Sequence, residues 1–138
     1  MYELQICQTE DELVKCFMLR NNYFIDKLHF DVFDVFDGLD ELSCNFLLLF
    51  NKLMIGSLRI RYSEDNDYIV EFITMDSISM HLDSLIELID YYMQSINVLE
   101  YFIAISKDYT ELFVMRGFVT TNKSTKDFIY LKKYLLEV

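Results

Sequence analysis

Glu71 is the residue whose position in this sequence most directly suggests chemistry. It is the one charged residue in the segment Tyr68–Met75 (YIVEFITM), which is otherwise almost entirely apolar. A carboxylate held in such surroundings can serve as a general base. The alternative is an ion pair with Arg59 or Arg61, which are two residues apart and therefore on the same side of a preceding strand. The sequence leaves both interpretations open.

A second set of candidate residues lies in the segment 30–37 (FDVFDVFD), where aspartates recur at every third position. The carboxylates of Asp34 and Asp37 either face solvent or form an acidic rim over a pocket, and both alternatives stay open. A metal site is disfavoured, because no histidine and no second carboxylate cluster is placed to complete one. We therefore expect no metal cofactor.

Glu71 belongs to a strand–loop–helix unit around which we expect the other elements to be arranged. Residues 68–75 are nearly all β-branched or aromatic, which predicts a buried strand. Apolar residues then recur at i, i+3, i+4 and i+7 over residues 82–96, which predicts an amphipathic helix. Ser84 and Glu87 fit a capping box at the start of that helix.

The connecting loop, residues 76–81 (DSISMH), is a candidate ligand site. At such a turn the free N–H groups of the first helical turn point outward and carry partial positive charge. The loop contains neither glycine nor lysine, so it differs from an ordinary phosphate-binding loop. Asp76, Ser77 or Ser79 could each begin the helix earlier. His81 could carry protons, or it could be an exposed histidine with no chemical role.

The remaining elements follow from capping, turn and strand signals. In chain order they are a strand at 2–7, a helix from the Thr9 capping box to about Asn21, a helix or turn at 23–36, a hairpin of strands 45–50 and 53–62 with its turn at 51–52, a strand at 100–106, a helix at 108–116 ended by Gly117, and a closing hairpin at 118–121 and 127–135 around residues 122–124. Gly56, inside a strand, indicates a bulge or a close backbone approach.

Length and charge limit the classes of function. The 138 residues, 53% of them hydrophobic, are enough for one domain (1–138) with a full core. The net charge of −11 argues against nucleic acid as a partner, because binding it requires a basic surface that displaces counterions. It likewise argues against an anionic membrane surface. It favours a small cationic or neutral substrate, or a basic protein partner. The oligomeric state stays open, with a homodimer among the alternatives.

The location that we expect is the cytoplasm. The longest wholly apolar run, residues 46–50, is far shorter than a membrane span, and residues 1–5 do not resemble the start of a signal peptide. Cys7, Cys16 and Cys44 are odd in number and lack metal-type spacing, which suits a reducing compartment.

Several motifs in this order of elements resemble those of the GNAT superfamily, the acyl-CoA-dependent N-acyltransferases. Residues 56–59 (GSLR) resemble the G-x-x-R of the family's third strand, and residues 115–118 (MRGF) resemble the end of its Y-x-x-x-G-F motif. Glu71 falls where the family often keeps a carboxylate. The resemblance implies an α/β (α+β) three-layer sandwich, in which a mixed sheet of six or seven strands has helices on both faces. The sheet should splay between residues 68–75 and 100–106.

The first half is similar to one branch, the acyl-homoserine-lactone (autoinducer) synthases, which carry the pattern R-x-x-x-F … W … D-x-F-D. Arg20 and Phe24 match its beginning, and Phe30 stands where that branch has tryptophan. The resemblance implies a substrate pocket lined by Arg20, Phe24, Phe30, Asp34, Asp37 and Arg59.

The resemblance also implies a donor, acetyl-CoA or another acyl-CoA, held by the residues that follow the fourth strand: Met75, Asp76, Ser77, Ile78, Ser79, Met80 and His81. Active acetyltransferases carry glycines in this loop, so that backbone N–H groups can approach the diphosphate. Here there is none, and Asp76 adds a negative charge. The family's general-acid tyrosine corresponds to Phe113, which cannot donate a proton. Tyr109 is the candidate replacement, and Glu71 is the candidate general base.

Two functions are therefore predicted. The first is a small cytosolic N-acyltransferase that moves an acyl group from acyl-CoA to an amine. The second is a catalytically inactive GNAT-fold binding or regulatory module with weak or no CoA binding. The retained polar residues of the substrate pocket favour the first, whereas the glycine-free loop and Phe113 favour the second. From the loop we expect acyl-CoA to bind with a dissociation constant of order 0.1–1 mM.

Overall fold

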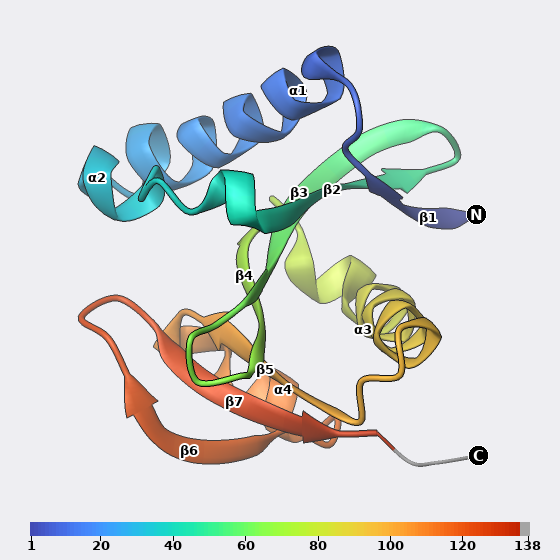
Figure 1. The fold of residues 1–138 in the computed structure, drawn as a ribbon, viewed down its shortest axis with the longest axis vertical. Coiled ribbons are helices and arrows are strands. Elements are labelled where there is room, and N and C mark those ends of the chain that lie inside the picture. Colours follow the sequence, from blue (N-terminus) through green and yellow to red (C-terminus); the bar gives the residue numbers. More distant parts are fainter. Residues whose placement is uncertain (136–138) are drawn as a thin grey trace.

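The strands of the chain form one mixed sheet in the order β1–β2–β3–β4–β5–β7–β6, as the computed structural model shows for the described residues 1–135 (Figure 1). The strands are β1 (Tyr2–Ile6), β2 (Ser43–Phe50), β3 (Leu53–Tyr62), β4 (Tyr68–Thr74), β5 (Glu100–Ile105), β6 (Val119–Ser124) and β7 (Ile129–Tyr134). Neighbouring strands pair antiparallel except β4 and β5, which run parallel. The predicted element order and the mixed sheet are confirmed.

Helices cover both faces of the sheet, so the predicted three-layer arrangement is also confirmed (Figure 1). They are α1 (Glu10–Arg20), the π-helix η1 (Asn21–Lys27), α2 (Val32–Val35), η2 (Asp40–Leu42), α3 (Ile78–Ser95), η3 (Lys107–Tyr109) and α4 (Thr110–Val114). Helices α1 and α2 lie on one face, and α3 lies on the other. Among the described residues, no helix has the length and apolar character needed to cross a membrane.

Helix α1 begins at the predicted capping box. The Thr9 hydroxyl accepts a hydrogen bond from the Glu12 N–H at 3.2 Å, and the Glu12 carboxylate accepts one from the Thr9 N–H at 2.9 Å. The helix continues into η1 without a break. Cys16, Arg20 and Phe24 recur at intervals of four residues and are all buried, which defines the face that packs on the sheet.

Helix α3 begins at Ile78, so the capping box at Ser84 and Glu87 does not begin it, and the earlier start that the sequence allowed at Ser77 is confirmed. Ser77 is the N-cap residue, although its side chain makes no capping hydrogen bond. Burial explains the earlier start, because Ile78 is buried and extends the apolar stripe by one turn. The stripe consists of Ile78, Leu82, Leu85, Ile86, Ile89 and Met93. It packs with α4 and the sheet in the main core.

Strand β4 contains a bulge that separates it from β5. Arg59 of β3 pairs with Glu71, but Ser57 pairs with Thr74, so β4 has one residue more than β3 over this stretch. Phe72, in the bulge, has a φ of +52°, an uncommon conformation for an aromatic residue. A bulge bends its strand. Strands β4 and β5 accordingly pair only where Ile69 and Val70 meet Phe102 and Ile103, and then diverge, as predicted (Figure 1).

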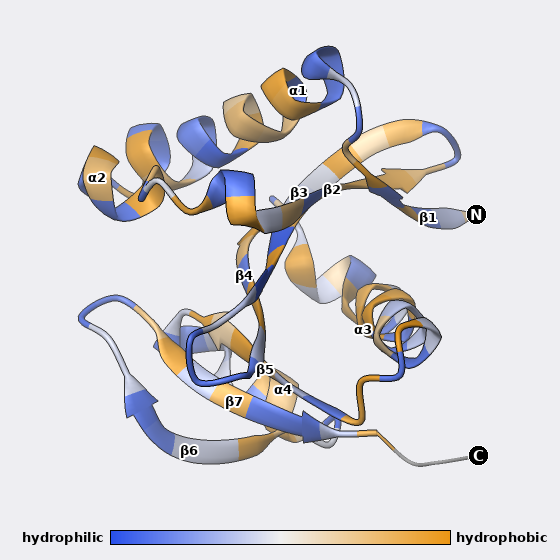
Figure 2. Cartoon of the chain, viewed as in Figure 1, coloured by the Kyte–Doolittle hydropathy of each residue, from blue (hydrophilic) through white to orange (hydrophobic). Residues whose placement is uncertain are grey.

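The β2–β3 hairpin turns at Asn51–Lys52 as predicted, with φ of +50° and +69°. The close approach expected at Gly56 is confirmed, because a Cβ there would lie 2.3 Å from the carbonyl oxygen of Thr74. The closing hairpin differs from the prediction. Residues 122–124 belong to β6, and the turn falls at residues 125–128, where the Thr125 N–H donates to the Phe128 carbonyl at 2.8 Å. Figure 2 shows that this turn and the β3–β4 turn are both largely hydrophilic.

Candidate active site

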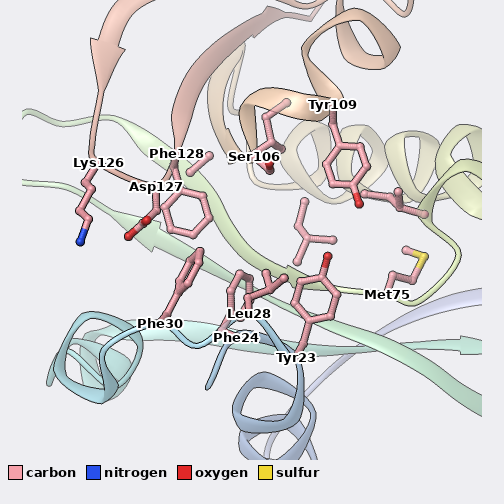
Figure 3. Close-up of a pocket in the computed structure, with 14 residues that line it drawn as sticks. Tyr23, Phe24, Leu28, Phe30, Met75, Ser106, Tyr109, Lys126, Asp127 and Phe128 are labelled. Carbon is pink, nitrogen blue, oxygen red and sulfur yellow. The ribbon is translucent and has the colours of Figure 1, made fainter. Parts of the chain in front are cut away.

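A cavity of about 290 Å³ opens where β4 and β5 diverge (Figure 3). Its walls come from η1 and the segment after it, the ends of β4 and β5, the start of α3 and the β6–β7 turn. They are formed by Tyr23, Phe24, Leu28, Phe30, Ile73, Met75, Ile78, Ala104, Ile105, Ser106, Tyr109, Lys126, Asp127 and Phe128. Most of these side chains are apolar or aromatic, and we call this space the apolar cavity.

A second cavity of about 270 Å³ adjoins the first, and we call it the polar cavity. It is lined by Asp34, Asp37, Arg61, Glu71, Phe72, Ala104, Thr125, Lys126, Asp127, Phe128 and Tyr130. Ala104 and the segment 126–128 line both cavities. An apolar space therefore meets a charged one beside the bulge of β4.

Aromatic rings separate the two cavities. The ring centroid of Phe24 lies 5.5 Å from those of Phe30 and Phe72 and 6.0 Å from that of Phe128. Phe30 and Phe128 are 5.6 Å apart. Contacts at these distances stabilise aromatic pairs beyond the area that they bury. Phe24 and Phe30, which the resemblance assigned to the substrate pocket, thus lie in the wall of the apolar cavity.

Arg59 is the centre of a buried ion-pair network beside the polar cavity. Its side chain is 0% exposed. It donates one hydrogen bond to each carboxylate oxygen of Asp37 at 2.8 Å, and its Nε donates to Glu71 at 2.8 Å. Asp40 lies 3.4 Å away. The structure therefore brings together three of the residues that the sequence singled out, on β3, on β4 and between α2 and η2.

Glu71 is bound by two arginines. Its Oε2 accepts hydrogen bonds from the Nε atoms of both Arg59 and Arg61 at 2.8 Å, and its Oε1 accepts one from Arg61 at 3.2 Å. The ion pair that the sequence allowed for Glu71 is therefore observed. Its service as a general base stays a prediction.

Arg20 extends the same network from α1. It donates two hydrogen bonds of 2.9 Å to Asp40 and one of 2.7 Å to the buried side chain of Asn45. Its guanidinium also lies 4.9 Å from the ring centre of Phe72, and that of Arg59 lies 4.8 Å from it. Cation–π attraction from these two arginines helps to hold Phe72 in its unusual backbone conformation.

The network shifts the pKa values of its members. Burial acts to raise the pKa of Asp37, but the hydrogen bonds from Arg59 and the Leu39 N–H, with the charge of Arg59, outweigh it, so that this pKa lies below its usual value. The pKa of Arg61 is raised, chiefly by its hydrogen bond to Glu71. Asp37 and Arg61 are therefore held in their charged forms.

Two tyrosines face each other across the apolar cavity. In Figure 3 the hydroxyl groups of Tyr23, on η1, and Tyr109, on η3, point toward one another. Burial, the neighbouring Tyr109 hydroxyl and the charge of Asp76 raise the pKa of Tyr23 to about 12. The Tyr109 hydroxyl thus lies in the cavity, where the candidate role of proton donor requires it. Phe113, at the family's acid position, is 0% exposed and packs on Phe118.

The loop predicted to hold a cofactor divides into residues that line the apolar cavity and residues that do not. Met75 and Ile78 line it. Asp76 is 91% exposed and lies 3.7 Å from Lys27, so the structure supplies a cation that the loop itself lacks. Ile78 to His81 form the first turn of α3 and are not part of the loop. Ser77, Ser79 and Met80 are exposed.

His81 lies away from both cavities. Its Nδ1 is hydrogen-bonded to the Tyr2 hydroxyl at 2.6 Å, and the two rings make an edge contact.

Asp34 is exposed at the rim of the polar cavity and has no ion pair among the described residues. Within residues 1–135, no group of three or more His, Cys, Asp or Glu side chains is arranged to hold a metal ion.

Sequence reasoning missed several residues of the site: Tyr23, Asp40, Asn45, Phe72, Asp127 and Phe128. Only Phe72 could have been found from the sequence, because it follows Glu71 in the strand that was expected to diverge from residues 100–106. The others come from three separate stretches, at residues 23, 40–45 and 127–128, and meet through the sheet and the turn at 125–128.

No family model and no curated protein matches the sequence. Solved structures do match the fold. FeeM, an N-acyl amino acid synthase from uncultured soil microbes, aligns over 98% of this chain and 90% of its own with a TM-score of 0.77 and 12% identity. An acyl-CoA N-acyltransferase from Pseudomonas aeruginosa aligns over 96% and 99%, with a TM-score of 0.76 and 14% identity.

An acetyltransferase of the GNAT family from Staphylococcus aureus aligns over 99% of this chain and 100% of its own, with a TM-score of 0.70 and 8% identity. At these identities the likeness shows the fold. The chain therefore has the GNAT fold, as its motifs predicted.

Proposed function

We propose that this chain is a small N-acyltransferase that moves an acyl group from acyl-CoA to an amine. The observation that carries the proposal is the pair of adjoining cavities at the divergence of β4 and β5. An acyl donor needs an apolar channel, and an amine acceptor, a cation at neutral pH, needs carboxylates nearby. The neighbours with this fold, which include an acyl-CoA N-acyltransferase, support the same class of reaction.

The donor's pantetheine and acyl chain would lie in the apolar cavity, between the ends of β4 and β5. The diphosphate would lie at the start of α3, near the N–H groups of Ile78 and Ser79, because the Met80 N–H already donates to the Ser77 carbonyl at 3.1 Å. Asp76 points outward to Lys27, so its charge is partly neutralised. The apolar part of the donor therefore fits the site well, and its phosphates fit less well.

Tyr109 would donate the proton that the departing thiolate needs, and its hydroxyl faces the cavity. The pairing of Glu71 with two arginines favours a positioning role for this residue beside the amine.

We propose that the acceptor is a small amine or the amino group of a basic protein. The three cysteines, all unpaired, support a cytoplasmic location.

One set of observations favours an inactive binding module instead. Phe113 occupies the family's acid position inside the core, and the loop before α3 has no glycine. Such a protein would bind acyl-CoA or a related ligand without turnover.

Calorimetric titration with acetyl-CoA and octanoyl-CoA tests the proposal. Each buried methylene contributes about 0.8 kcal/mol, so octanoyl-CoA should bind at least tenfold more tightly if its chain enters the apolar cavity. Leu28→Trp should weaken that binding about tenfold, because Leu28 lies in the cavity wall and the larger indole ring would occupy part of the cavity. Leu28 is 40% exposed, so the larger ring does not have to fit into the core. The matched control is Leu42→Trp, whose leucine is 80% exposed and lines neither cavity.

Thiol release from octanoyl-CoA in the presence of n-butylamine then distinguishes the two functions. Turnover that Tyr109→Phe reduces by tenfold or more supports the transferase. Binding without turnover supports the module. Equal binding by the Leu28 and Leu42 variants, or no binding at millimolar concentration, would refute the donor site.

A further inference from the structure

Asp127 is a carboxylate that the network beside the polar cavity does not use. Among the described residues it is the one acidic side chain that lines both cavities. It is half-buried, and no hydrogen bond or ion pair to its carboxylate is formed within residues 1–135. Figure 3 shows this carboxylate at the edge of the apolar cavity, next to Phe128.

The turn that carries Asp127 is held in place at both ends. The Thr125 N–H donates to the Phe128 carbonyl at 2.8 Å, and the Phe128 N–H donates to the Thr125 hydroxyl at 3.1 Å. The Phe128 ring packs on Phe24 and Phe30 across the cavities. The aromatic contacts thereby fasten the β6–β7 turn to η1 and the segment after it, with Asp127 at the junction.

The other carboxylates of the polar cavity are less suited to receive an ammonium group. Asp37 and Glu71 already accept hydrogen bonds from guanidinium groups on both of their oxygens. Asp34 is exposed at the rim of the polar cavity, where solvent screens its charge. Asp127 is half-buried, and its carboxylate oxygens accept no hydrogen bond within residues 1–135. Solvent therefore screens the attraction of Asp127 for a cation less than it screens that of Asp34.

We propose that Asp127 binds the ammonium group of the acceptor and is the general base of the transfer, an assignment that rests on the proposed function. The carboxylate takes one proton from the ammonium group, which leaves a neutral amine. The amine nitrogen bonds to the thioester carbonyl carbon as the carbon–sulfur bond breaks. The thiolate takes a proton from Tyr109. The second proton lost by nitrogen restores the tyrosine through solvent, and Asp127 releases its proton to solvent.

The first test measures binding without any donor. n-Butylammonium is titrated into the protein while the side-chain carboxyl carbon of Asp127 and the amides of residues 125–128 are followed by NMR. We expect saturable shifts at these positions and at least tenfold weaker binding to Asp127→Asn. Asp65→Asn, which changes an exposed aspartate in the β3–β4 turn, is the matched control and should bind as the wild type does.

The second test measures chemistry with octanoyl-CoA and n-butylamine. Asp127→Asn should lower kcat/KM for the amine by about 100-fold or more and remove the acidic limb of its pH profile, as loss of a general base does. Its affinity for octanoyl-CoA should stay within twofold of the wild type. A structural role for Asp127 would lower affinity for both ligands and leave the shape of the pH profile unchanged.

The outcomes separate this proposal from the proposed function. If octanoyl-CoA binds but n-butylammonium causes no shift at residues 125–128, or binds Asp127→Asn equally well, the assignment of Asp127 is refuted and the donor site stands. If n-butylammonium binds at Asp127 but octanoyl-CoA does not bind, the cation site stands and the transferase is refuted. If turnover is unchanged in Asp127→Asn, another residue is the base.

Discussion

Replacing Arg59 with methionine is the sharpest test of how this site is held together. Arg59 is fully buried, and it neutralises Asp37 and Glu71 on two different elements. Methionine keeps most of the volume of the side chain and removes its charge. The variant therefore isolates the electrostatic contribution from the packing contribution.

The expected loss of stability is about 3–5 kcal/mol, the usual range when one partner of a buried ion pair is removed. Glu71 keeps Arg61, and Asp37, whose side chain is 25% exposed, keeps the Leu39 N–H and some water. Because these partners remain, the loss of stability should not exceed about 5 kcal/mol. Phe72 also loses one of its two cations, which contributes about 1 kcal/mol.

Urea unfolding followed by circular dichroism measures this loss. For a slope of about 2 kcal/mol per molar urea, the midpoint should fall by roughly 2 M. Arg61→Met is the matched control. Arg61 is partly exposed and, within residues 1–135, pairs with Glu71 alone, so we expect a loss below about 2 kcal/mol.

Two results would refute this reasoning. The first is an Arg59→Met midpoint equal to that of the wild type or of Arg61→Met, which would make the network a surface feature. The second concerns the double variant Arg59→Met with Asp37→Asn. It should be more stable than Arg59→Met alone, because within the described residues Asp37, unlike Glu71, has no second arginine once Arg59 is replaced. A double variant that is less stable would show that packing, and not charge, dominates at this position.

Two further predictions concern the backbone and the pH dependence. Gly56→Ala should cost about 1–3 kcal/mol in a urea titration, because its Cβ would lie 2.3 Å from the Thr74 carbonyl oxygen and must displace β4; an unchanged midpoint would contradict the close approach. The folded-state pKa of Asp37 is below its ordinary value of 3.8, so its stabilisation is present above that value and is lost as the pH falls through the folded pKa. Asp37→Asn should therefore be less stable than the wild type at pH 6, with a difference that shrinks below pH 4 in acid titrations; a constant difference would contradict the pairing.

The sequence was sufficient for elements whose signals are local. The capping box at Thr9, the Asn51–Lys52 turn and the glycine that ends α4 each depend on residues within one turn of the chain, and the structure has each of them. The apolar period of α3 likewise depends on its own residues. Only its start stayed open between Ser84 and the earlier residues, and burial of Ile78 decided for Ser77.

The family motifs added part of the site. They predicted that Arg59 would meet at least one of Asp34, Asp37 and Glu71 and that β4 would leave β5. Arg59 binds Asp37 and Glu71, and β4 and β5 pair only at Ile69–Val70 and Phe102–Ile103. They did not predict the pairing of Arg20 with Asp40, because a motif specifies which residues recur and not which residues they bond.

Only the tertiary structure decided what lies at the junction of the two cavities. Tyr23 faces Tyr109 and Phe128 packs on Phe24 because the divergence of β4 and β5 brings η1 against the β6–β7 turn. No local pattern encodes a contact between residues a hundred positions apart, since such a contact depends on sheet order and on the bulge at Phe72. The sequence by itself therefore determined the elements and the fold, whereas the register of the sheet decided which side chains could act together.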